Sequence, residues 1–86
     1  MSLAKMIQEA IKNKKAIIGY RESVKYLKMN KAELIIIAEN SPEKIKKEIE
    51  HIAKTDGIKL ETVKDSIELG VMCGKPFPVT TLVIKG

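Results

Sequence analysis

An unbroken run of five aliphatic residues, Leu34–Ala38, lies in the segment ELIIIAEN (residues 33–40). A strand with one face in water alternates apolar and polar side chains, whereas a continuous apolar run is typical of a strand that is buried on both faces. Such a strand needs a layer of helices on each side of its sheet. The run therefore predicts an α/β fold in which residues 33–40 form a central strand.

The segments on either side of this run alternate between helical and strand patterns. The expected helices cover residues 3–12, 21–29, 42–56 and 65–73, and the further strands cover residues 16–19, 58–63 and 79–85. The order α-β-α-β-α-β-α-β, with short connections, indicates a three-layer α/β/α sandwich with a four-stranded mixed sheet. Because 86 residues suit one domain, the chain 1–86 is expected to fold as a single unit.

Local signals support these boundaries. Ser2 is a suitable N-cap for the first helix, and Ser41 for the third, with Pro42 in the first helical position. Asp65 and Glu68 have the spacing of a capping box at the start of the fourth helix.

The charge balance points to a class of partner. The chain carries 16 basic and 11 acidic residues, so its net charge is +5 and its isoelectric point is near 9.4. That balance favours a polyanion such as nucleic acid. The single cysteine, Cys73, excludes an internal disulfide and fits a reducing cytosol. No apolar run reaches the ~18–20 residues of a membrane span, and no signal-peptide pattern opens the chain, so we expect a soluble intracellular protein without membrane contact.

Residues suited to catalysis or metal binding are few. His51 is the only histidine and falls off the apolar stripe of its helix, as surface residues do. One histidine and one cysteine cannot supply the three or four ligands of a zinc site. The segment GVMCGKP (70–76) differs from a phosphate-binding loop in its spacing and in the proline after Lys75, so Gly74 is better interpreted as a helix-terminating glycine. We expect no catalytic residues, no metal and no cofactor.

A glycine turn and a row of cations follow the first expected strand. On a helical wheel, three side chains fall within roughly 60° of one another: Arg21, Lys25 and Lys28. Gly19 permits close approach to the backbone, and the first turn of the helix presents unpaired amides that favour a phosphate. The pair Lys14–Lys15, just before the strand, is expected to add to the local charge. The same pattern also fits an ordinary solvated face.

Two further positions suit RNA recognition. Phe77, the only phenylalanine, stands between two prolines just after Lys75, where it is either a core residue or a platform for an unstacked base. Asn40 lies at the carboxyl end of the central strand, a usual ligand position in α/β sheets. Its alternative role is to cap a helix or a turn.

Three segments together resemble a known family. GYRESVK (19–25), LIIIAENSP (34–42) and ELGVMCGKPFPV (68–79) occur in the order and at the intervals of the archaeal and eukaryotic large-subunit ribosomal protein family numbered thirty (L-thirty-e). That family is a branch of the kink-turn RNA-binding superfamily, which includes L-seven-Ae. The resemblance covers essentially the whole chain. It implies a non-enzymatic, RNA-binding component of the large ribosomal subunit in an archaeon, which recognises a kink-turn-like internal loop.

Carried over position by position, the resemblance implies three RNA-binding elements: a glycine-led loop that enters a helix, the end of the central strand, and the loop before the last strand. Their residues here are Gly19, Arg21, Glu22 and Lys25, then Asn40, then Phe77, Pro78 and Val79, with Lys28 and Lys75 as additional cations. Glu22 is expected to accept a hydrogen bond from a guanine edge, and Lys25 to contact a phosphate or a base carbonyl. Phe77 is expected to cover an unstacked base. The wider superfamily has asparagine where this chain has Arg21.

Three other functions are compatible with the sequence. A stand-alone kink-turn-binding protein of an RNA-processing or regulatory particle shares all the features above. A small enzyme or ligand-binding domain would use segment 73–77, and a purely structural interaction domain would use none of the cations. Under the ribosomal interpretation we expect ribosomal RNA and other ribosomal proteins as partners, a cytoplasmic location on the ribosome, and a monomer when free.

Overall fold

The aliphatic run forms the strand around which the chain folds. The computed structural model describes residues 2–86, and in it this strand, β2, spans Ala32–Ala38. The other strands are β1 (Ala16–Ile18), β3 (Lys59–Val63) and β4 (Thr81–Lys85). The helices are α1 (Leu3–Lys12), α2 (Tyr20–Met29), α3 (Glu43–Asp56) and α4 (Ser66–Met72). The predicted elements are therefore present in the predicted order.

The strands form one mixed sheet in the order β1-β4-β2-β3. β2 pairs in parallel with β3 and antiparallel with β4, and β1 pairs antiparallel with β4. Ile36 of β2 therefore has Glu61 on one side and Leu82 on the other. Residues 34–38 are all buried, as a continuous apolar run in an inner strand predicts.

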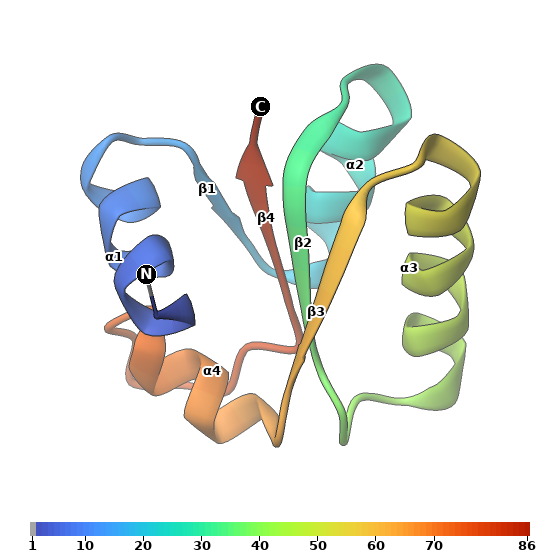
Figure 1. Ribbon diagram of the computed structural model, residues 1–86. Helices are drawn as coiled ribbons and strands as arrows, with labels where there is room; N and C mark the ends of the chain where they lie inside the picture. The colour runs from blue at the N-terminus through green and yellow to red at the C-terminus, as the bar shows by residue number, and fades with distance from the viewer. Residues whose placement is uncertain (1) are drawn as a thin grey trace.

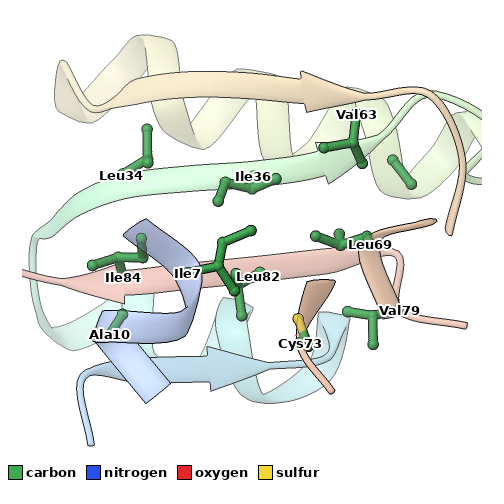
Figure 2. Close-up of a cluster of buried hydrophobic side chains, with 11 residues drawn as sticks. Ile7, Ala10, Leu34, Ile36, Val63, Leu69, Cys73, Val79, Leu82 and Ile84 are labelled. Atoms are coloured by element: carbon green, nitrogen blue, oxygen red, sulfur yellow. The ribbon is translucent and has the colours of Figure 1, made fainter. Parts of the chain in front are cut away.

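Alternate side chains of β2 enter different cores. Leu34 and Ile36 contribute to the cluster under α1 and α4, which Figure 2 shows, together with Ile7, Ala10, Val63, Leu69, Cys73, Val79, Leu82 and Ile84. Ile35 and Ile37 contribute to the cluster under α2 and α3, together with Leu27, Ile49, Ala53, Ile58 and Val83. Figure 1 shows the two helical layers on opposite faces of the sheet. The predicted three-layer α/β/α sandwich is confirmed.

Two of the three predicted helix caps are present. The Ser2 side chain accepts a hydrogen bond from the Lys5 amide (3.3 Å), and the Asp65 carboxylate accepts one from the Glu68 amide (2.7 Å). Each side chain satisfies an amide that has no partner within its helix. The longest helix, α3, has 14 residues, and no helix within residues 2–86 is long and apolar enough to cross a bilayer.

The third predicted cap, at the start of α3, is wrong. Pro42 is the N-cap of this helix, and the buried Ser41 hydroxyl donates instead to the Ala38 carbonyl at 2.7 Å. Ser41 belongs to the turn that follows β2: its amide donates to the same Ala38 carbonyl at 3.1 Å, so its hydroxyl is directed to the end of the strand and not to the helix. α3 thus begins without a side-chain cap.

Candidate nucleic-acid interface

Four connections meet at one edge of the sheet, which we call the loop edge. Because β1, β2 and β3 run in one direction and β4 runs against them, three carboxyl ends and one amino end lie together. The Gly19 amide donates to the Thr81 carbonyl, and the Ala38 amide donates to the Thr80 carbonyl, both at 2.9 Å. In Figure 1 the ends of β2 and β3 and the start of β4 lie toward the bottom, and β1 passes into α2 nearer the middle of the view. The three predicted RNA-binding elements, far apart in sequence, are neighbours there.

Helix α2 begins at the loop edge without a side-chain cap. Gly19 is its N-cap and has a φ of 107°, which residues with a side chain rarely adopt. Amides of the first turn have no partner within the helix, and they form the positive end of the helix dipole. Arg21, Glu22 and Lys25 are exposed on the first two turns. This end of α2 therefore combines donors for an anion with one carboxylate acceptor.

Only part of the predicted cationic surface lies at this edge. Lys28 is two turns beyond Arg21, about 10 Å further along the helix axis. The pair Lys14–Lys15 precedes the opposite end of β1, where the Lys15 carbonyl accepts from the Lys85 amide at 2.8 Å. The prediction that these two lysines add to the charge beside Gly19 is wrong, because a three-residue strand of about 10 Å separates them from it.

Glu22 and Lys25 both line a shallow hollow beside α2. It has a volume of about 270 Å³, and its other lining residues are Ile17, Tyr26, Met29 and Asn30. Met29 is 86% exposed. The hollow therefore brings together a carboxylate acceptor and an ammonium donor, whose predicted partners are a guanine edge and a phosphate or base carbonyl.

Asn40 links two of the connections. Its side-chain oxygen, Oδ1, accepts a hydrogen bond from the amide of Ser66, the first residue of α4, at 2.9 Å. Because a backbone amide only donates, the group that faces it is the carbonyl oxygen, and the two N–H donors on Nδ2 stay outside this contact. Asn40 therefore performs the capping role left open by the sequence, and its exposed amide group keeps donors for a ligand.

The connection between α4 and β4 lies tightly against α4. The Lys75 amide donates to the Gly70 carbonyl, and the Val79 amide donates to the Ser66 carbonyl, both at 2.9 Å. Phe77 lies between the two residues that make these hydrogen bonds, and 53% of its surface is exposed. This exposure excludes the alternative that Phe77 is a core residue. Its ring is available as a surface for an unstacked base.

The predicted site residues differ in exposure. Lys75, Phe77 and Pro78 are exposed on the connection before β4. Val79 is 2% exposed, and its side chain packs in the core beside Cys73 (Figure 2). The Val79 side chain is therefore unavailable to a ligand, and the residue anchors the loop that carries Phe77.

Two exposed apolar side chains beside this connection are not in the predicted set. Ile67 and Val71 are 65% and 70% exposed. They lie on the side of α4 opposite Leu69 and Cys73, which enter the core. The sequence already indicates their exposure. Apolar residues occur on two opposite sides of this seven-residue helix, and only one side can face the core.

Two residues with reactive side chains, His51 and Cys73, bear on the expected absence of a catalytic centre. His51 is exposed on α3. Cys73 is buried, and burial raises the pKa of its thiol, against a smaller opposite effect of Lys75, so its nucleophilic thiolate is disfavoured. Within residues 2–86, no three His, Cys, Asp or Glu side chains cluster closely enough to hold a metal ion.

The sequence matches one protein family over its full length. The model of the ribosomal protein L7Ae/L30e/S12e/Gadd45 family matches residues 1–86. The large ribosomal subunit protein eL30 of Methanothermobacter thermautotrophicus is 37% identical over 86 residues, covering 99% of this chain and 88% of that protein. The eL30 of Branchiostoma belcheri is 40% identical over 84 residues, covering 96% of this chain and 74% of that protein.

The fold also has relatives among solved structures. The 15.5 kD RNA-binding protein of Giardia lamblia superposes with a TM-score of 0.88 at 22% sequence identity. The match covers 98% of this chain and 71% of that one. At this level of identity the likeness concerns the fold.

Proposed function

Because the chain belongs to the ribosomal protein L7Ae/L30e/S12e/Gadd45 family, we propose that it is an RNA-binding structural component of the large ribosomal subunit. Its eL30 relatives from archaea support this proposal by their names and by near-complete coverage of the chain. The partners are then ribosomal RNA and neighbouring ribosomal proteins, and the site of action is the ribosome in the cytoplasm. Free of RNA, the protein is a monomer, and it has no catalytic role.

The observation that carries the proposal is the convergence of three elements at the loop edge: the start of α2, the end of β2 and the loop before β4. A phosphate binds to the uncapped amides in the first turn of α2, which follows Gly19, and to the cations Arg21 and Lys25. These charges supply affinity without sequence information. Contacts to bases come from other groups, since specific RNA recognition uses unstacked bases and their edges.

Each of these base contacts has a group suited to it. The Glu22 carboxylate only accepts, and it therefore pairs with the N–H donors of a guanine edge. Asn40 offers its Nδ2 donors, because its oxygen is engaged by Ser66. The exposed Phe77 ring covers a base that has left the helical stack. A kink-turn-like internal loop presents sharply bent backbone and unstacked bases together, and this combination suits the three elements.

A binding titration tests the proposal. The wild-type protein is titrated with a kink-turn RNA and with a straight duplex of the same length, each at two salt concentrations. We expect tighter binding to the kinked RNA, and we expect Glu22→Gln to remove most of the preference. Glu50→Gln, at an exposed position on α3, is the charge-matched control. Equal, salt-sensitive binding to both RNAs would show that the protein binds RNA through its basic surface alone and does not recognise the kink, which would contradict the proposal.

A further inference from the structure

Within residues 2–86, three of the four most exposed large apolar side chains lie together on one side of the molecule. Ile67, Val71 and Phe77 are 65%, 70% and 53% exposed. They line one groove of about 360 Å³, with Lys75, Pro76 and Pro78 as the remaining lining residues. Contiguous exposed apolar surface on a small protein marks a binding site more often than isolated side chains do.

The groove has two walls from different elements. Ile67 and Val71 are one helical turn apart on the outer side of α4. The opposite wall is the loop that carries Phe77, and two backbone hydrogen bonds, to the carbonyls of Ser66 and Gly70, hold it against the helix.

Close packing fixes the distance between these walls. A Cβ atom on Gly70 would lie 2.2 Å from the Phe77 carbonyl oxygen, so the loop approaches α4 as closely as a glycine allows. Pro76 and Pro78 restrict the backbone on either side of Phe77. Because the walls are held in place before any ligand arrives, little ordering cost opposes binding in this groove.

We propose that this groove holds the unstacked nucleobase that Phe77 covers, and that Ile67 and Val71 of α4, which are outside the predicted set of RNA-binding residues, form the second wall of its site. Ile67 and Val71 cover one side of the base, the Phe77 loop covers the other, and Lys75 neutralises the adjoining phosphate. Two observations favour a nucleobase over an apolar protein segment. The groove is continuous, through Phe77, with the proposed RNA surface, and the one charged side chain in its lining is a cation. The inference rests on the proposed function.

The test replaces the helical wall and keeps the loop. The double variant Ile67→Gln/Val71→Gln removes the apolar surface at two exposed helical positions, where glutamine preserves helix propensity. The double variant Ile67→Leu/Val71→Leu is the matched control that keeps this surface apolar. Both are titrated with the intact kink-turn RNA and with a series in which each unpaired nucleotide in turn is made abasic. Circular dichroism melting verifies that the variants fold.

We expect the glutamine variant to raise the Kd for intact RNA roughly five- to thirty-fold, the lower part of the range for loss of an aromatic stacking surface because this wall is aliphatic, and the leucine variant to bind like wild type. For one abasic RNA, wild type and glutamine variant should bind equally, because the base that contacts α4 is already absent. That equality identifies the nucleotide in the groove.

Two results would overturn the inference while leaving the proposed function intact. In the first, wild type prefers the kinked RNA and the glutamine variant binds it equally well, which would show that no nucleobase of this RNA depends on the groove. In the second, the glutamine variant loses the same factor on every abasic RNA, so that no base interacts with the helical wall. If wild type does not distinguish kinked from straight RNA, the proposed function fails, and this inference fails with it.

Discussion

Gly70 and Phe77 are in contact so close that a single added carbon would not fit between them: a Cβ atom on Gly70 would lie 2.2 Å from the Phe77 carbonyl oxygen. This glycine lies inside a helix and does not need an unusual backbone conformation. Its role is to let the loop before β4 lie flat on α4. The position of the exposed Phe77 ring therefore depends on a residue in another element.

Replacing Gly70 by alanine should destabilise the protein by about 1–3 kcal/mol, the usual cost of overpacking. The sign is informative, because Gly→Ala inside an unconstrained helix normally stabilises by roughly 0.5–1 kcal/mol. Urea unfolding measures the difference, with Val71→Ala on the exposed side of the same helix as control. A stabilised Gly70→Ala protein with unchanged RNA affinity would contradict the tight contact.

Phe77→Ala should separate RNA binding from stability. Because the ring is 53% exposed, its removal should cost less than about 1 kcal/mol of unfolding free energy, against about 2–5 kcal/mol for the buried Leu69→Ala. RNA binding should weaken by about 1–3 kcal/mol if a base stacks there. Unfolding curves and RNA titrations of both variants give the comparison, and a large stability loss with unchanged affinity would assign Phe77 to packing alone.

Lys25→Ala should change the salt dependence of RNA binding. If Lys25 neutralises one phosphate, the slope of log K against log salt concentration should decrease in magnitude by roughly 0.7–0.9. Lys54→Ala, at an exposed position in the last turn of α3, is the control and should leave the slope unchanged. Titrations at four salt concentrations determine both slopes. An unaltered slope for Lys25→Ala would show that Lys25 does not contact a phosphate.

The stability of the protein should decrease at alkaline pH. Burial raises the pKa of the Cys73 thiol above its ordinary value of 9.0, and Lys75 opposes this only in part. Between the two pKa values the native state keeps a proton that the unfolded chain has lost, so the free energy of unfolding falls as pH rises. It should be insensitive to this group at lower pH and decline above about pH 9.

Urea unfolding between pH 7 and pH 10.5 tests this dependence. Cys73→Ala should have a shallower decline, because its side chain does not titrate. The hydrogen bond from the Tyr20 hydroxyl to the Glu48 carboxylate raises the pKa of Tyr20 as well. A Tyr20→Phe variant therefore serves to separate its contribution, and parallel curves for wild type and Cys73→Ala would exclude the thiol as the cause.

Much of the fold follows from patterns that are local in sequence. The run Leu34–Ala38 predicts an inner strand because only burial on both faces accommodates continuous aliphatic side chains. The caps at Ser2 and Asp65 are predictable because the donor and the acceptor are three residues apart. Ser41 has the same composition signal, yet its hydroxyl bonds to the end of β2. The Ser41 amide donates to the same Ala38 carbonyl at 3.1 Å, so the turn that ends β2 directs the hydroxyl, and composition alone does not distinguish this turn from a helix cap.

The candidate site divides in the same way. The sequence by itself determined the chemical groups: a glycine turn before cations, a carboxylate beside them, and a lone phenylalanine between prolines. The tertiary structure decided which of these groups meet. It buried the Val79 side chain and exposed Ile67 and Val71 beside Phe77. The separation of Lys14–Lys15 from Gly19, in contrast, follows already from their order on either side of the predicted first strand. The physical reason is that the sheet order β1-β4-β2-β3 arises from contacts between distant segments, whereas periodicity and capping report only on neighbours along the chain.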